Sequence, residues 1–223
     1  MTMGTCSTQA YGEAWYWDKR YAHESGPFDW YQNYSTMAPL INLYLPRSHG
    51  HHRILVVGCG NSAFSEEMAD DGYAEVVNID ISSVVIEAMQ KKHSNRPQLT
   101  WTLDSLLCGN NSRLNAGNML EEVWRVLKDK GVYILITYGA PTYRLHLLRD
   151  SCLWTIKLHV IEKLVSGESP EHPIWKLTDP VPLDDDGSSV EAVLGQNPDI
   201  HYIYICTKDL SLKAGPKHEV AVE

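Results

Sequence analysis

Two short apolar runs separated by a helical stretch stand out in the first half of the chain. Residues 54–57 are apolar and mostly β-branched, too few for a helix, and they end at a glycine turn over 58–60. Such a run is typical of a strand buried in a parallel sheet. We expect a helix over 65–71 and a second strand over 75–79, with Asp80 at its C-terminal end. The pattern therefore predicts a β-α-β unit.

The rest of the chain continues to alternate between helical and extended patterns. Ser82 or Ser83 is a suitable N-cap for the helix that follows it. The last two extended segments alternate polar and apolar residues, which favours an antiparallel pair at one edge of the sheet. This succession predicts an α/β fold with helices over 84–92 and 115–130, and with strands over 99–102, 132–137, 154–161 and 201–207.

Differences in composition along the chain predict how it is divided. Its 223 residues suffice for one large α/β domain with a sizeable core. Residues 165–200 are rich in Pro, Asp, Gly and Ser, which predicts a flexible insertion. We therefore expect an N-terminal aromatic segment over 1–50, a domain over 51–210 that contains this insertion, and a tail over 211–223.

The glycine turn and Asp80 together form a pattern that binds cofactors containing adenosine. Gly58 and Gly60 allow the backbone to approach a ligand, because no Cβ stands in the way. Asp80 lies about twenty residues beyond the turn, where a carboxylate can accept hydrogen bonds from both ribose hydroxyls. The spacing Gly58-x-Gly60-x-x-Ala63 fits nicotinamide enzymes as well as methyltransferases. A structural turn without any ligand is a third interpretation.

Charge and cysteine usage narrow the range of partners. The formal net charge of −9 argues against a broad basic surface for nucleic acid. No apolar run approaches the ~18 residues of a membrane span, and the N-terminus lacks the basic and apolar regions of a signal peptide. The five cysteines are scattered without metal-ligand spacing, which favours reduced thiols and a cytoplasmic location. We expect no metal, no nucleic acid and no membrane as partners.

The layout of the chain favours a methyltransferase over a dehydrogenase. Few residues precede the first predicted strand, whereas a nicotinamide enzyme usually needs a second domain for its substrate. An antiparallel pair at the end of the sheet resembles the seven-stranded S-adenosylmethionine methyltransferases. The resemblance implies a Rossmann-like sheet with helices on both faces. In these enzymes the counterpart of Asp80 holds the ribose, and the turn over 58–60 passes beneath the methionine part.

Several motifs resemble one eukaryotic family of such enzymes. They are Tyr16-Trp-Asp-Lys-Arg-Tyr21, Phe28-Asp-Trp-Tyr31, Val57-Gly-Cys-Gly-Asn-Ser62, Asp80-Ile-Ser-Ser-Val-Val85 and Glu121-Glu-Val-Trp-Arg-Val-Leu127. Together they are similar to the lysine methyltransferases of translation elongation factor 1-alpha, of the methyltransferase-like 13 type. The resemblance covers residues 11–163 and 201–208.

The resemblance also implies which residues bind S-adenosyl-L-methionine. In the family, the positions that match Trp17, Tyr21 and Trp30 close over the cofactor, although aromatic residues at such positions also serve in ordinary packing. No residue is nominated for catalysis. The expected cofactor contacts are Trp17, Tyr21, Trp30, Gly58, Gly60, Asn61, Asp80 and Ile81.

One departure from the family pattern follows the third predicted strand. The family has an acidic residue that contacts adenine there, then a loop and the central fourth strand, whereas this chain continues directly to a later family motif at Leu103. A segment between Thr102 and Leu103, strand four included, is therefore expected to be missing. Its loss would expose backbone groups and apolar faces on the two neighbouring strands. Asp104 matches a family acid but is equally suited to cap a helix, so it is not taken as catalytic.

The family implies transfer of a methyl group from a sulfonium to a lysine amine. This reaction requires orientation of the two groups and a deprotonated amine, which desolvation favours. We expect a protein substrate, with elongation factor 1-alpha as the candidate, and an activity impaired by the missing segment. Two alternatives are a catalytically inactive truncated isoform and an NAD(P)-dependent oxidoreductase.

Overall fold

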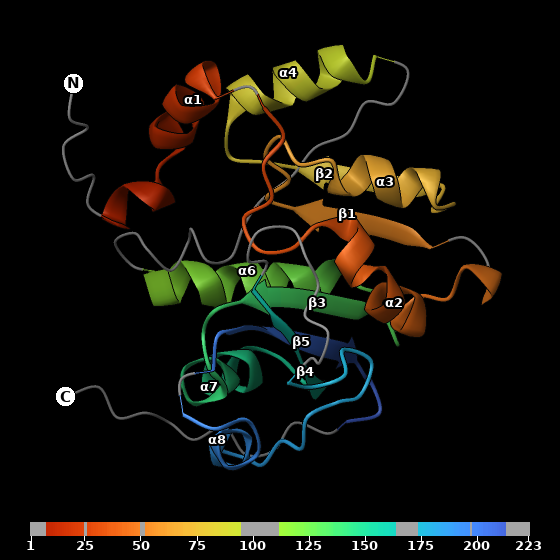
Figure 1. Cartoon of the computed structure of the whole chain (residues 1–223), viewed down its shortest axis with the longest axis vertical. Helices are drawn as coiled ribbons and strands as arrows, with labels where there is room; N and C mark the ends of the chain where they lie inside the picture. The colour runs from red at the N-terminus through yellow and green to blue at the C-terminus, as the bar shows by residue number, and fades with distance from the viewer. Residues whose placement is uncertain are drawn as a thin grey trace. The chain divides into compact units, whose positions relative to one another are not determined.

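The chain divides into two compact units. The structure, a computed structural model, describes residues 8–24, 26–49, 52–94, 112–163, 174–196 and 198–212. Unit 1 comprises Met1–Ala116 with Lys163–Glu171, and unit 2 comprises Gly117–Glu162 with His172–Glu223. Among the described residues, unit 1 holds a two-stranded sheet and unit 2 a three-stranded sheet (Figure 1). The expected boundaries at residues 50 and 210 remain predictions.

Unit 1 is built on a parallel pair of strands. Strand β1 (Arg53–Val57) pairs in parallel with β2 (Glu75–Ile79), and Arg53 lies opposite Glu75 in the register. Helix α3 (Phe64–Asp70) connects the two strands (Figure 1). The predicted β-α-β unit is therefore confirmed in its order and in the direction of its strands.

The two faces of this sheet differ in burial. On one face Val76 and Asn78 are buried, and the hydroxyl of Ser65 on α3 donates a hydrogen bond to the side-chain oxygen of Asn78. On the other face Leu55 and Val77 lie opposite each other in the register, and each is 45% exposed. Side chains alternate between the faces of a strand, so burial of one face does not ensure burial of the other. The prediction of a fully buried first strand is thus wrong for one face.

The described residues of the N-terminal segment form short helices. Helix α1 (Ala14–His23) follows a 3-10 helix, Thr8–Gly12, and lies beside helix α4 (Ser83–Lys92) (Figure 1). Helix α2 (Tyr34–Tyr44) begins at Asn33, whose side chain accepts a hydrogen bond from the Thr36 amide at 3.0 Å. A second 3-10 helix, Arg47–His49, then leads to β1. The predicted helix over 84–92 is confirmed, with Ser82 as its N-cap.

Unit 2 is an antiparallel sheet with helices. Its elements are α6 (Ser112–Val126, most of which lies in this unit), β3 (Val132–Thr137), α7 (Pro141–Ser151), β4 (Trp154–Glu162), α8 (Ser188–Leu194) and β5 (Ile200–Lys208). Strand β5 lies between β3 and β4 and is antiparallel to both. The predicted antiparallel pairing of the last two strands is confirmed. The third partner, β3, is the predicted strand over 132–137.

The core of unit 2 lies around β5. Ile203, Tyr204 and Ile205 are fully buried. At the end of the same strand, the ammonium group of Lys208 donates hydrogen bonds to the carbonyl oxygens of Trp124 at 2.6 Å and Leu127 at 2.7 Å. Trp124 lies in the last turn of α6 and Leu127 directly follows the helix, where backbone acceptors have no partner within the helix. Lys208 therefore joins the end of α6 to β5.

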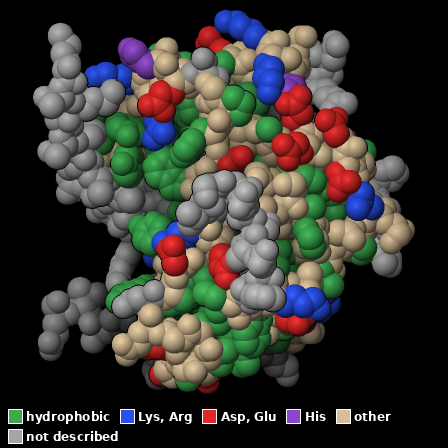
Figure 2. Space-filling view, viewed as in Figure 1, with side chains coloured by type: hydrophobic (Ala, Val, Ile, Leu, Met, Phe, Trp, Pro, Cys, Tyr) green, Lys and Arg blue, Asp and Glu red, His purple; other side chains and the backbone are tan. Residues whose placement is uncertain are grey.

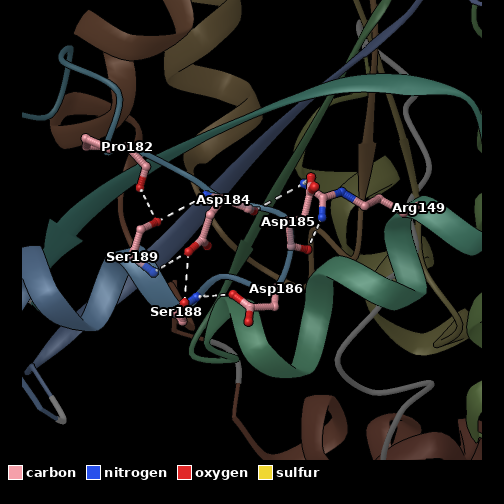
Figure 3. A network of polar contacts seen from close by, with 7 residues as sticks. All are labelled: Arg149, Pro182, Asp184, Asp185, Asp186, Ser188 and Ser189. Carbon is pink, nitrogen blue, oxygen red and sulfur yellow. Dashed lines mark hydrogen bonds and ion pairs between the residues drawn. The ribbon is translucent and has the colours of Figure 1, made fainter.

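Part of the stretch expected to be a flexible insertion carries local structure. Figure 3 shows Asp184 beside the start of α8, where its Oδ2 accepts hydrogen bonds from the Ser188 hydroxyl and the Ser189 amide, both at 2.8 Å. Arg149 on α7 donates to the carbonyl oxygens of Asp184 and Asp185. These contacts organise residues 184–189. Flexibility of the whole stretch 165–200 remains a prediction.

The described residues contain five strands in two sheets, so a seven-stranded sheet is not confirmed. In the described part of the chain, β1 pairs with β2 alone and β3 pairs with β5 alone. Both would adjoin the fourth strand in the family sheet, and the absence of that strand from this chain remains a prediction. The predicted strand over 99–102 and Asp104 lie outside the described residues. Among the described helices, none is long and apolar enough to span a membrane.

Candidate cofactor site

The glycine turn follows β1 and lies within hydrogen-bonding distance of the end of β2. The Gly58 amide donates a hydrogen bond to the carbonyl oxygen of Ile79 at 3.2 Å. Gly58 and Gly60 have φ angles of 80° and 50°, in the left-handed region that favours glycine. A Cβ on Gly60 would collide with the hydroxyl of Tyr21. The turn therefore needs glycine at position 60 for its backbone angle and for the close approach of Tyr21.

Asp80 lies directly after β2 and is held by two backbone donors. Its Oδ2 accepts a hydrogen bond from the Gly60 amide at 3.1 Å, and its Oδ1 accepts one from the Ser82 amide at 2.8 Å. Burial raises the pKa of the Asp80 carboxyl, and the hydrogen bonds from Ser82 and Gly60 oppose this shift. A carboxylate oxygen accepts more than one hydrogen bond, so both oxygens retain capacity for hydroxyl donors.

Tyr21 on α1 extends from the N-terminal segment to the glycine turn. Burial, followed by the negative charge of Asp80, raises the pKa of its hydroxyl above the ordinary value of 10.0. The hydroxyl is therefore protonated at neutral pH and available as a hydrogen-bond donor. Tyr21, Gly60 and Asp80 lie together, although the first is distant from the others in sequence.

The three aromatic residues of the expected lid belong to one cluster. The Trp17 and Tyr21 rings are stacked with centroids 6.0 Å apart, and the Trp17 and Trp30 rings meet edge to face at 5.8 Å. The guanidinium of Arg20 lies 5.2–5.8 Å from the ring centroids of Trp17, Phe28 and Trp30. Trp17 is 8% exposed and Trp30 is 47% exposed. Packing accounts for Trp17 by itself, whereas Trp30 has surface left to cover a ligand.

Asn61 has an unused acceptor beside the turn. Its side-chain nitrogen donates to the carbonyl oxygens of Gly26 at 2.5 Å and Glu24 at 3.2 Å, which ties the turn to the segment after α1. Its Oδ1 is buried and has no hydrogen-bond partner among the described residues. A buried acceptor without a partner is costly unless a ligand or water supplies a donor. The polar groups of the turn thus suit a ligand that carries hydroxyl and ammonium donors, as S-adenosylmethionine does.

Sequence reasoning missed a further acid, Asp18, at this site. Its Oδ1 accepts a hydrogen bond from the Ser82 hydroxyl at 2.6 Å and another from the Val84 amide at 3.3 Å. Asp18 lies on α1 and Ser82 precedes α4, so the contact joins segments that are far apart in the sequence. Ile81, which was expected to contact the cofactor, is half-buried between Asp80 and Ser82. The sequence around Asp18 does not predict this contact. The only available signal was that Asp18 belongs to the motif Tyr16-Trp-Asp18.

The described residues offer no metal centre, since no group of three His, Cys, Asp or Glu side chains among them is arranged to hold an ion. Three histidines, His49, His51 and His52, precede β1 in the sequence. The Nε2 of His52 contacts the carbonyl oxygen of Pro46 at 3.0 Å. His51 lies outside the described residues. The candidate site therefore rests on hydrogen-bonding groups and aromatic surface.

Comparisons with known proteins found a family model and a solved structure that are similar to this chain. The model of the thiopurine S-methyltransferase family matches residues 13–110. The crystal structure of the [4+2]-cyclase SpnF aligns with 94% of this chain and 99% of its own, at a TM-score of 0.45 and 15% identity.

Curated relatives match more of the chain than the family model does. EEF1A lysine methyltransferase 4 of Bos taurus is 32% identical over 180 residues, which are 66% of this chain and 69% of that protein. The eEF1A lysine and N-terminal methyltransferase of Homo sapiens is 29% identical over 188 residues, and the match spans 26% of its length. The first match covers more than two thirds of the relative at over 30% identity. The chain belongs to the EEF1A lysine methyltransferase family.

Proposed function

We propose that this chain is an S-adenosylmethionine-dependent protein-lysine methyltransferase whose substrate is elongation factor 1-alpha. The observation that carries the proposal is the meeting of Asp80, Gly60 and Tyr21 at the ends of two parallel strands, in a chain of this family. The names of the relatives supply the substrate. A cytoplasmic location goes with that substrate and is part of the proposal.

Each end of the cofactor has a group that suits it. The Asp80 carboxylate would accept hydrogen bonds from the ribose hydroxyls, and the backbone of Gly58 and Gly60 would pass beneath the methionine part. The unpartnered Oδ1 of Asn61 would accept a hydrogen bond from the ammonium of that part. Trp30 and Tyr21 would cover the bound molecule, and Ile81 would line the adenosine side. All of these groups lie in unit 1.

Methyl transfer requires few reactive side chains from the protein. S-adenosylmethionine supplies a methyl group on a positively charged sulfur. The lysine nitrogen of the substrate forms a bond to this carbon as the carbon–sulfur bond breaks, and the nitrogen must have lost its proton to solvent beforehand. The residues of this chain contribute by orienting the two groups and excluding water, which favours the neutral amine.

The charge of the chain suits a basic protein partner. Its net charge is −9, and acidic side chains gather on one part of the face shown in Figure 2, with basic ones interspersed. Such complementarity raises the association rate more than the affinity.

A second candidate function is that of a catalytically inactive binding form. The exposed pair Leu55 and Val77 favours it, because among the described strands β1 pairs with β2 alone. Strand four would supply groups at its tip that face the methyl group in the family, and the described strands contain no counterpart of it.

Calorimetry followed by a transfer assay tests both candidates. The purified full chain is titrated with S-adenosylhomocysteine and separately with NAD. It is then incubated with tritiated S-adenosylmethionine and elongation factor 1-alpha, beside a relative that carries an insert between the positions of Thr102 and Leu103. Binding with slow or absent transfer supports the inactive form, and transfer equal to that of the relative supports a competent enzyme. Tighter binding of NAD than of S-adenosylhomocysteine would overturn the methyltransferase proposal.

A further inference from the structure

We propose that Asp18 is a positioning residue for the cofactor site, which acts through Ser82 on the carboxylate of Asp80. This inference rests on the proposed function, since it assigns a role within the same site. Asp18 would hold the carboxylate in the orientation that receives the ribose hydroxyls, and it would hold helix α1 at the start of α4.

Ser82 contacts both acids with different atoms. Its hydroxyl donates to Asp18 Oδ1 at 2.6 Å, and its amide donates to Asp80 Oδ1 at 2.8 Å. Ser82 is fully buried, which limits the access of water to either contact. Removal of the Asp18 acceptor would leave a buried hydroxyl proton without a partner, which is costly.

The hydroxyl of Ser82 makes a second hydrogen bond, whose geometry depends on its donation to Asp18. It also accepts a hydrogen bond from the Val85 amide at 3.3 Å, which caps helix α4. A hydroxyl has one proton, and donation of that proton to Asp18 points a lone pair at the Val85 amide. Asp18 thereby fixes the backbone at Ser82, and with it the amide that holds Asp80.

Asp18 lies on the same helix, α1, as two residues of the expected lid. Trp17 precedes it, and Tyr21, which follows by one turn of α1, reaches Gly60. The Val84 amide adds a second hydrogen bond to Asp18 at 3.3 Å, so the contact joins α1 to the first turn of α4 at two points. One side chain thus sets the position of the lid helix and of the ribose acceptor together.

A test must separate positioning of Asp80 from general support of the fold. The full chain is titrated by calorimetry with S-adenosylhomocysteine and with its 2′,3′-dideoxy analogue. The dissociation constant of the analogue divided by that of S-adenosylhomocysteine measures how well the ribose hydroxyls are recognised. Asp80→Ala sets the ratio expected when that recognition is lost.

We expect Asp18→Ala and Ser82→Ala to weaken binding of S-adenosylhomocysteine about tenfold, the scale of one hydrogen bond to a charged group. The analogue should lose less, so the ratio should fall toward that of Asp80→Ala. Asp18→Asn keeps an oxygen acceptor for Ser82 and should restore most of the ratio. Lys19→Ala on α1 and Glu87→Ala on α4, both exposed, serve as controls and should leave it unchanged.

The outcomes distinguish this inference from the proposed function. A wild-type chain that does not bind S-adenosylhomocysteine overturns the proposed function, and this inference with it. A wild-type chain that binds, with Asp18→Ala weakening both ligands by the same factor, overturns the inference alone. If Asp18→Ala does not fold, Ser82→Ala and Asp18→Asn decide, because an unchanged ratio in Ser82→Ala contradicts the positioning role.

Discussion

The hydroxyl of Tyr21 lies against Gly60, in the space that a Cβ at position 60 would occupy. A side chain from the first helix thus shapes a turn that lies between two strands much further along the chain. This relationship makes the identity of residue 60 important for folding before any ligand is considered.

Gly60→Ala should therefore lower the free energy of unfolding by about 1–3 kcal/mol, because alanine is strained at a φ of 50° and its Cβ displaces Tyr21. Urea denaturation measures the loss. Gly26→Ala is the matched control, since a Cβ there meets nothing within 4 Å, and it should change stability by less than about 0.5 kcal/mol. Equal stability of the two variants would contradict the close contact.

Asp80→Ala should weaken binding of S-adenosylhomocysteine by about 1.5–3 kcal/mol, the scale of a hydrogen bond to a charged group. Titration calorimetry measures the change, with Asp150→Ala, an exposed acid of unit 2, as control. An affinity that is unaffected by the Asp80 substitution would show that the ribose is held elsewhere.

Trp17 and Trp30 should differ in what their loss affects. Trp17→Ala removes a buried ring and should cost about 3–5 kcal/mol of stability. Trp30→Ala removes a half-exposed ring, so it should leave the melting temperature almost unchanged and weaken cofactor binding several-fold. Melting curves with and without S-adenosylhomocysteine make the comparison. A Trp30 variant with wild-type affinity rules out its place in the lid.

Lys208→Met should destabilise unit 2 by about 1–3 kcal/mol, because two partly buried carbonyls at the end of α6 lose their donor. Lys130→Met is the control, since Lys130 makes an exposed ion pair with Asp209 and its loss should matter little. Urea denaturation of both variants provides the comparison. A larger loss for Lys130 would contradict the cap on α6.

Acidification should destabilise unit 2 through His159. Burial lowers the pKa of this side chain, which accounts for its neutral form beside the carbonyl oxygen of Leu177 at 2.8 Å. The unfolded chain binds a proton near pH 6.5, before the folded chain does. Stability should therefore be full above pH 6.5 and decline as the pH falls below it. His159→Gln should flatten this decline in urea titrations at pH 7.5 and 5.5, and an identical pH dependence would exclude His159 as the cause.

Local patterns predicted the strands around the glycine turn and the antiparallel strands of unit 2. The apolar run 54–57 and the alternation in 154–161 are properties of a few neighbouring residues, and these elements formed as expected. The local apolar run predicted burial of Leu55, whereas its exposure depends on what covers that face of the sheet. The contact between Asp18 and Ser82 was missed for a related reason, since nothing in either local pattern specifies a partner so far along the chain.

The position of β5 between β3 and β4 determines when unit 2 is able to form. This strand ends at Lys208 and is made last, yet both other strands of the sheet pair with it. A ribosome adds about 5–20 residues per second, so β3 and β4 exist for seconds in the nascent chain before their shared partner emerges. The pairing of β1 with β2 needs no such delay. A transcript that ends before β5 would leave both remaining strands of that sheet without a partner, and its product would be a target for chaperones and proteases.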